Sequence, residues 1–135
     1  MPLWDQINRS LYPEFGDSIS VWNSSPTAAY FSSGSSSNYL VNAADAYYGN
    51  TGWDGYGGVH GFCGNATDGF ALLNDSTLPG KDYSYRRHTE AHELGHALTL
   101  DHADGYVAVM STTDTSYYSP QQHDIDDMNA RYPWP

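Results

Sequence analysis

The chain lacks features on which several classes of protein depend. Its 135 residues include a single cysteine, Cys63, so no disulfide can form within it. No apolar run approaches the ~20 residues of a membrane-spanning helix, so no membrane partner is predicted. Lys and Arg number only 5 against 16 Asp and Glu, which gives a net charge of −11. Nucleic acid is not predicted as a partner either, because so acidic a surface repels phosphates.

Lysine and glutamate are also scarce. Lys81 is the only lysine, and only three of the acidic residues are glutamates. Such surfaces are typical of secreted or salt-exposed proteins, and clustered aspartates can also bind Ca²⁺, although a solvated acidic surface is the simpler interpretation. The chain opens at Met1 without the basic and apolar leader of a signal peptide. We interpret it as a mature secreted domain with an added start methionine, an intracellular protein being the alternative, and the charge favours a monomer.

The order of elements predicts one α+β domain over residues 1–135. Residues 49–58 (GNTGWDGYGG) contain too much glycine for regular structure and are predicted to form a loop. The last helix is predicted to begin at Ser119-Pro120, a capping serine before a proline at the first helical position, with Gln122 completing a capping box. Strands are predicted at residues 3–7, 27–32, 39–44 and 69–74, and helices at 13–22, 84–98 and 119–132.

One short stretch, HELGHALTLDH at residues 92–102, carries three histidines. Residues four apart on a helix differ by about 40° in direction, so His92 and His96 point to one side and can bind one metal ion. Glu93 is one step further round, where its carboxylate can reach a water on the open side of the metal. Zinc lowers the pKa of such a water towards about 7, and a carboxylate can take its proton as the water attacks a carbonyl. The spacing therefore fits a hydrolase.

A catalytic zinc ion needs a third protein ligand. His102 lies six residues beyond His96, about 600° of rotation, so it can face the metal only if the helix ends near residues 98–100 and the chain turns back. His88 is the alternative, since it shares a helix face with His92 and His96. It would lie about 12 Å from His96 along the axis, too far for one tetrahedral ion. We therefore predict His102 as the ligand and His88 as an exposed residue.

Residues 92–102 resemble the zinc-binding segment His-Glu-x-x-His-x-x-Gly-x-x-His of the metzincin metalloproteases. Residues 106–110 (YVAVM) look like the methionine turn of that family, and the step from His102 to Met110 is the spacing of the matrixin branch, the relatives of the matrix metalloproteinases. The ending SPQQHDIDDMNARYP is similar to the matrixin C-terminal helix, and YYGNTGWDGYGG to a loop of bacterial and archaeal matrixin-like proteases. The resemblance is close over residues 84–132 and looser before them.

The resemblance implies a metzincin-like catalytic domain. Its upper subdomain, about residues 1–98, would hold a twisted mixed β-sheet with two helices, and its small lower subdomain, about residues 99–135, would end in a helix. One catalytic Zn²⁺ is implied, with Met110 supporting the site from below and Glu93 acting as general base and acid. The implied zinc ligands are His92, His96 and His102.

The same resemblance implies where a protein or peptide substrate would lie. It would run extended between the subdomains and pair with an edge strand, which binds backbone regardless of side chain. Residues 69–74 (GFALLN) are the predicted edge strand, and residues 111–118 (STTDTSYY) would wall the pocket after the scissile bond. The predicted substrate-binding residues are Phe70, Ala71, Leu72, Tyr117 and Tyr118.

Thr99 departs from the pattern, because it stands where the family has glycine. Glycine there allows the left-handed turn that brings the third histidine back, and a β-branched residue in that conformation costs roughly 1–2 kcal/mol or more. Metal binding can release roughly 10 kcal/mol or more in structural zinc peptides, so the turn can still form. The alternative is that the loop opens differently, His102 binds poorly, and activity falls.

Other residues with metal-binding or reactive side chains have simpler interpretations. His60 is predicted to be structural or exposed, and His123 exposed. Cys63 is predicted to be a small core residue, the alternative being a thiol that caps the zinc ion. Asp101 and Asp104 flank the third ligand, where they either face water, the favoured interpretation, or orient a histidine.

The sequence as a whole predicts a small secreted zinc endopeptidase that cleaves extended peptides. The alternative is a catalytically impaired metzincin-fold protein, inactive because of Thr99, that binds zinc and a protein partner without cutting it. Glu93 argues against this alternative, since zinc ligation alone has no need of it. The chain is also compatible with being one part of a longer precursor.

Overall fold

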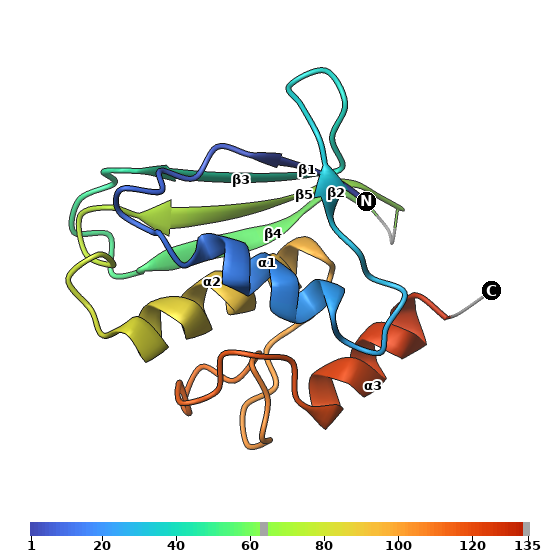
Figure 1. Ribbon diagram of the computed structural model, residues 1–135. Coiled ribbons are helices and arrows are strands. Elements are labelled where there is room, and N and C mark those ends of the chain that lie inside the picture. Colours follow the sequence, from blue (N-terminus) through green and yellow to red (C-terminus); the bar gives the residue numbers. More distant parts are fainter. Residues whose placement is uncertain (63–64, 134–135) are drawn as a thin grey trace.

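The computed structural model describes residues 1–62 and 65–133, so Cys63 lies outside the described residues. It contains a mixed five-stranded sheet and three helices (Figure 1), which confirms the α+β class. The strand order is β2-β1-β3-β5-β4; β4 and β5 are antiparallel, and the other neighbours are parallel. The elements are β1 (Pro2–Asp5), α1 (Phe15–Asn23), β2 (Ser32–Ser33), β3 (Val41–Ala46), β4 (Gly55–Phe62), β5 (Asn65–Asn74), α2 (Tyr83–Ala97) and α3 (Gln122–Arg131).

The helices lie on one side of the sheet (Figure 1). α2 packs directly on β4 and β5, α1 packs against α2, and α3 lies further from the sheet. The core fills the space between these layers, where Trp22, Leu94 and Met110 are almost fully buried. Trp22 also donates a hydrogen bond from Nε1 to the carbonyl of Ala91 at 2.9 Å, which fixes α1 against α2.

Two of the predicted helices are confirmed. α1 covers the predicted helical segment, with Phe15 and Trp22 buried and Ile19 partly buried, as expected for one apolar face. α2 begins and ends within a residue of the predicted limits. Among the described residues, no helix is both long and apolar enough to cross a membrane.

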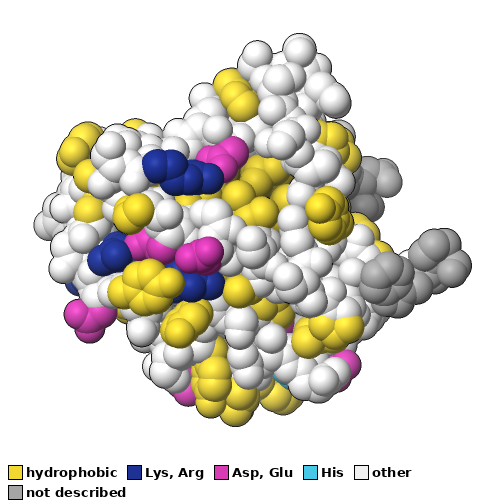
Figure 2. All heavy atoms as spheres, in the orientation of Figure 1, with side chains coloured by type: hydrophobic (Ala, Val, Ile, Leu, Met, Phe, Trp, Pro, Cys, Tyr) yellow, Lys and Arg dark blue, Asp and Glu magenta, His cyan; other side chains and the backbone are white. Residues whose placement is uncertain are grey.

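The face shown in Figure 2 presents its basic side chains next to acidic ones. Two ion pairs of this kind are formed by Arg86, which donates from Nε to Glu14 Oε1 at 2.6 Å, and by Arg9 with Asp5. On this face the few positive charges are therefore used locally and form no continuous basic patch among the described residues.

The predicted strand at residues 27–32 is wrong, because only Ser32 and Ser33 join the sheet, as the short strand β2. The backbone just before them forms hydrogen bonds with a side chain of α1 and not with a neighbouring strand. Asn23, at the end of α1, accepts a hydrogen bond from Phe31 N at 2.7 Å and donates one to Phe31 O at 3.0 Å. A side chain therefore satisfies the peptide groups that a neighbouring strand would otherwise satisfy.

The prediction that residues 49–58 form a loop is wrong in its second half, because Gly55–Gly58 begin β4. The glycines are needed for packing. A Cβ atom on Gly55 would lie 2.7 Å from Glu93 Cγ, and one on Gly57 would lie 2.7 Å from Glu93 O. β4 can thus rest directly on α2 only where it has no side chains on that face.

Two further predictions need correction. Residues 69–74 are not an edge strand, since β5 lies between β3 and β4, and β4 forms this edge of the described sheet. The last helix begins at Gln122, later than Pro120, because Gln121 is the N-cap and its capping box is made with Asp124. The carboxylate of Asp124 accepts a hydrogen bond from Gln121 N at 2.8 Å, which fixes the start of α3 there.

Candidate metal centre

The structure brings the three predicted zinc ligands together. His92 and His96 lie one turn apart on α2, with their Nε2 atoms 3.1 Å from each other. His102 reaches them from the loop after the helix, and one ligand atom from each of the three histidines lies within 4.8 Å of the others. These three side chains could therefore hold a metal ion.

The two helical histidines are oriented by hydrogen bonds to backbone carbonyls. Nδ1 of His92 bonds Val109 O at 2.9 Å, and Nδ1 of His96 bonds Leu100 O at 2.8 Å. Because each Nδ1 donates its proton to a carbonyl, each Nε2 keeps a lone pair for a metal. Burial lowers the pKa of His92 to about 3 and lowers the pKa of His96 as well, so both imidazoles are neutral, as metal binding requires.

The turn that delivers His102 has the predicted left-handed residue. Thr99 has a φ of +78°, the one positive φ among the described residues other than glycine. Thr99 N donates to His96 O and Leu100 N donates to Gly95 O, each at 3.0 Å. These two bonds form the Schellman motif that usually ends a helix with glycine. Threonine thus takes the conformation that the turn demands, at a cost of roughly 1–2 kcal/mol.

Glu93 lies beside the cluster, with Oε1 4.0 Å from Nε2 of His96. It is only 6% exposed, since β4 covers it on one side through Gly55 and Gly57. Burial raises the pKa of Glu93 to about 8. A cation bound by the histidines would favour the ionised carboxylate and oppose this shift.

Met110 packs against the helix that carries two of the candidate ligands. It is 1% exposed, and a Cβ atom on Gly95 would lie 2.4 Å from its Sδ atom. Its carbonyl accepts a hydrogen bond from Ala103 N at 3.0 Å, next to the third ligand. Met110 therefore contacts both the helix and the loop that together form the centre.

Sequence reasoning missed Asp124, which holds this turn in place. Asp124 is 1% exposed, and its two oxygens accept hydrogen bonds from Val109 N at 2.7 Å and Met110 N at 3.2 Å. Val109 is also the residue whose carbonyl orients His92. The sequence placed Asp124 within the last helix, but neither its place in the first turn nor its contact 15 residues upstream was visible.

A cavity of about 430 Å³ opens beside the three histidines. It is bounded by α2, the start of β4, the loop before β4, and the first residues of the segment 111–118. The segment 111–118 thus borders the cavity through Ser111, Thr112 and Thr115. The lining residues are Gly52, Trp53, Asp54, Gly55, Tyr56, Gly57, Tyr85, His88, Thr89, His92, Glu93, His96, His102, Ser111, Thr112 and Thr115.

The prediction that His88 is exposed is wrong. Its side chain is 4% exposed, lines the cavity, and bonds Tyr117 O from Nδ1 at 2.6 Å. The reason is tertiary, because the segment 111–118 folds back across the first turns of α2. His88 is thereby used to hold that segment, and it is not part of the cluster that could hold a metal ion.

None of the predicted substrate-binding residues lines this cavity. Phe70 and Ala71 lie in the interior strand β5, and Ala71 is buried. Tyr118 packs against Arg87, whose Cζ is 4.8 Å from the ring centre. The argument for Phe70, Ala71 and Leu72 depended on an edge strand, whereas the strand at this edge of the described sheet is β4.

The remaining candidates lie outside the cluster. His60 is exposed on β4 and bonds Asp68 Oδ2 at 2.8 Å. His123 is partly buried, with its ring centre 4.0 Å from that of Tyr106. Asp101 and Asp104 are exposed, and Asp104 bonds the backbone and hydroxyl of a threonine and no histidine.

Neither a scan of protein-family models nor a search of curated proteins finds a match to this chain. What this centre can do must therefore be inferred from its geometry. Two neutral imidazoles, one buried and one partly buried, and a third, exposed imidazole face one point, with a buried carboxylate beside them and an adjoining cavity.

Proposed function

We propose that the chain is a zinc-dependent endopeptidase of the metzincin type, with a matrixin-like site. The observation that carries the proposal is the convergence of His92, His96 and His102 within 4.8 Å, beside Glu93 and at the edge of a cavity. A purely structural zinc site is usually closed by four protein ligands, whereas three ligands leave a position open for chemistry.

The donor set fits zinc better than harder cations. Imidazole nitrogen is a preferred ligand of zinc, while Ca²⁺ and Mg²⁺ prefer oxygen. Two nitrogens bound at 2.0–2.1 Å to a tetrahedral ion stand about 3.3 Å apart. The Nε2 atoms of His92 and His96 are already 3.1 Å apart. A ring nitrogen of His102 lies within 4.8 Å of the ligand atoms of His92 and His96, so His102 could complete the set.

Glu93 supplies the proton transfer in this proposal. Zinc, when bound, acts as a Lewis acid that makes a water acidic enough to attack near neutral pH. Glu93 takes the proton of that water during attack on the peptide carbonyl and passes it to the leaving amine. Its place next to His96, on the cavity side of α2, gives it access to both partners.

An extended peptide would lie in the cavity along β4. Gly55, Tyr56 and Gly57 line the cavity, and they belong to the strand at the edge of the described sheet. An edge strand has free peptide groups that pair with another backbone. Binding through backbone suits a protease, because it tolerates many sequences.

The test is cleavage of casein by the zinc-loaded protein, compared with Glu93→Ala, with zinc content measured in both. We expect the parent to cleave and the variant to bind zinc with cleavage reduced at least ~10²-fold. Glu93→Gln, which keeps the shape of the side chain, should be impaired as well if the proton transfer is what matters.

The opposite result has a defined meaning. If both proteins hold zinc and neither cleaves, the endopeptidase proposal fails and a zinc-stabilised binding module takes its place. Thr99→Gly would then show whether the strained turn is responsible, because cleavage that appears in this variant assigns the defect to residue 99.

A further inference from the structure

The cavity beside the metal centre contains a second carboxylate, from Asp54, that the proposed reaction does not use. Apart from Asp54 and Glu93, the lining consists of glycine, aromatic, histidine and hydroxyl side chains. No Lys or Arg and no Val, Leu, Ile or Met is among the described lining residues. Glu93 belongs to the metal centre, so Asp54 is the carboxylate of this lining that could attract a positive charge from the substrate, and the lining offers little to a large aliphatic side chain.

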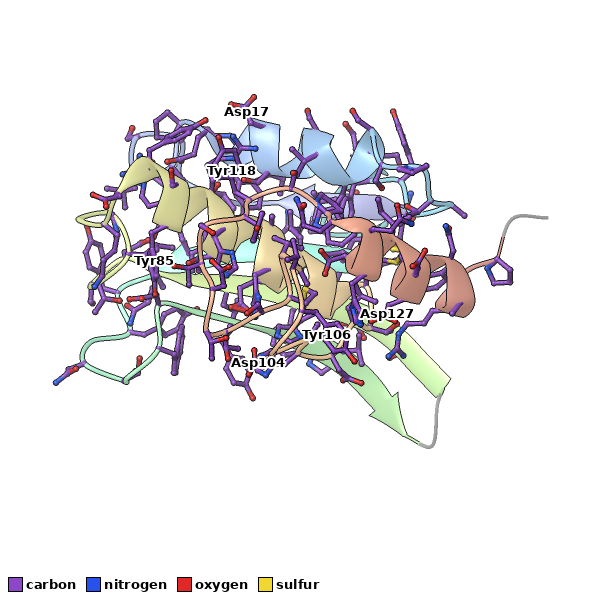
Figure 3. The ribbon with its side chains drawn as sticks, turned by 90° about the horizontal axis from the view of Figure 1, so that it is seen from below. Asp17, Tyr85, Asp104, Tyr106, Tyr118 and Asp127 are labelled. Carbon is purple, nitrogen blue, oxygen red and sulfur yellow. The ribbon has the colours of Figure 1, made fainter. Side chains whose placement is uncertain are left out.

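The carboxylate of Asp54 is held in a defined position. Its Oδ2 accepts a hydrogen bond from the Tyr85 hydroxyl at 2.5 Å, and its backbone carbonyl accepts one from Asn74 N at 2.8 Å. Tyr85 comes from the first turns of α2, as Figure 3 shows, so the carboxylate is fixed between the helix and the loop before β4. A carboxylate fixed in this way loses little entropy when it binds a partner.

The loop that carries Asp54 is itself held by one buried side chain. Asn74 is 0% exposed, and its amide donates to Gly49 O at 3.0 Å and Trp53 O at 3.1 Å. Its Oδ1 accepts from Tyr48 N at 3.2 Å. The glycine-rich loop is therefore anchored at its start and at its end, and it presents Trp53 and Asp54 to the cavity in fixed places.

Aromatic rings stand next to this carboxylate. Trp53 and Tyr56 line the cavity with ring centres 5.7 Å apart, and Tyr85 lines it as well. Ring faces attract ammonium and guanidinium groups. Lys81 already uses the Tyr85 ring in this way at 5.8 Å, but it does not line the cavity, and Asp54 forms no ion pair among the described residues.

We propose that Asp54, with the rings of Trp53 and Tyr56, binds a lysine or arginine side chain of the peptide substrate. This inference rests on the proposed endopeptidase function and adds a substrate class to it. Tyr85 precedes His92 by seven residues on α2, about 10 Å along the axis, or about three residues of extended peptide. The basic side chain therefore lies within about three residues of the bond that is cleaved.

The first test compares cleavage of matched fluorogenic peptides. One variable position holds Lys, Gln, Glu or norleucine, and it is moved through about three residues on either side of the scissile bond. We expect kcat/KM for the best Lys peptide to exceed that for its Glu counterpart by about tenfold, the size expected for a charge-assisted hydrogen bond. Asp54→Asn, which still accepts from Tyr85, should bring this ratio close to one.

Asp17→Asn is the matched control. It removes the same charge from an exposed residue of α1, on another side of the molecule in Figure 3, and the Lys-to-Glu ratio should change less than about twofold. Cleavage without a preference for Lys, or a preference that survives in Asp54→Asn, would overturn the inference and leave the endopeptidase proposal standing.

A binding experiment separates the two proposals further. Zinc-loaded Glu93→Ala holds peptides without cutting them, so fluorescence anisotropy can measure the Kd of the Lys and Glu peptides directly. If the parent cleaves nothing, the endopeptidase proposal fails. The inference about Asp54 still stands if Glu93→Ala binds the Lys peptide about tenfold more tightly and loses this difference with Asp54→Asn added. Equal binding of both peptides overturns it.

Discussion

The candidate metal centre combines side chains from two regions of the chain, and these regions are held in place in different ways. α2 supplies His92 and His96 from consecutive turns of one helix, which its own hydrogen bonds and a buried face keep rigid. The segment 98–121 contains no helix or strand, yet it supplies His102 and Met110. Local periodicity places the first two ligands, whereas a few tertiary hydrogen bonds place the third. The segment should therefore fail first when the protein is perturbed.

The largest effect is expected from Asp124→Ala, which removes the anchor of the segment 98–121. Two buried peptide N–H groups, of Val109 and Met110, would lose their acceptor. We expect the free energy of unfolding to fall by roughly 2–3 kcal/mol and zinc affinity to fall roughly 10–100-fold. Chemical denaturation and zinc titration measure the two quantities.

Asp126→Ala is the control for this prediction, since Asp126 is exposed on the same helix and, among the described residues, its carboxylate bonds Gln122 alone. It should change stability by less than about 0.5 kcal/mol. Equal losses of zinc affinity in the two variants would show that Asp124 does not hold the centre.

Gly57→Ala perturbs α2, the other of the two regions, because it pushes β4 away from this helix. The new methyl group would meet Glu93 O at 2.7 Å and His96 Cβ at 3.0 Å. We expect a loss of stability of roughly 1–3 kcal/mol and a fall in kcat of about tenfold, because Glu93 and His96 must shift. Gly80→Ala, at a position with no atom within 4 Å of the added methyl, should leave both unchanged.

The pH dependence of stability tests a buried acid outside the segment 98–121, namely Asp75, which directly follows β5. Burial, together with a hydrogen bond to Asp45, raises the pKa of Asp75 from 3.8 to about 6 in the folded protein. The folded state then binds more protons than the unfolded state between these values, so the free energy of unfolding falls as pH rises from about 4 to 6. We expect a loss on the order of 1–2 kcal/mol in this window.

Asp75→Asn should make this part of the pH profile less steep, measured by urea denaturation of the metal-free protein. Part of the slope should remain, because burial also raises the pKa of Glu93, to about 8. Its side chain can still accept the hydrogen bond that Tyr12 donates to Asp75 at 2.7 Å. A profile that keeps its full slope in the variant would assign the effect to another acid.

The smallest effect is expected from Thr99→Gly, which removes strain at the junction of the two regions. Glycine takes a φ of +78° without the steric cost that threonine bears, but it loses more entropy on folding. We expect a net gain in stability of about 1 kcal/mol and a rise in zinc affinity of a few fold. Thr99→Ser keeps a side chain at the position and should show neither gain.

The same two regions differ in how well the sequence predicts them. His92, His96 and Glu93 were predicted because their spacing on one helix is local information. α1 and α2 were predicted because the apolar faces of helices repeat at short spacing. His102 was assigned because His88 would lie too far from His96 along the helix, and the resemblance to a known motif supported it. The turn that brings His102 back was not visible in helix periodicity.

Apart from the start of the last helix, which depends on the local bond between Gln121 and Asp124, the main errors concern contacts between distant parts of the chain. Gly55 and Gly57 look like loop residues until Glu93 is known to lie against them. His88 looks exposed until the segment 111–118 covers it. The edge of the sheet was misplaced because strand order depends on the whole topology, which no single strand reveals.

The buried amide of Asn74 has a consequence for producing the protein. Asn74, Asp75 and Ser76 form an N-glycosylation sequon, yet the side chain of Asn74 is inaccessible and fully bonded once the chain is folded. An oligosaccharide transferred to it before folding would keep the loop from closing round the amide. A eukaryotic secretory host would therefore yield two populations, misfolded chains glycosylated at Asn74 and native chains unmodified at Asn74, and a host that does not glycosylate would yield only native chains.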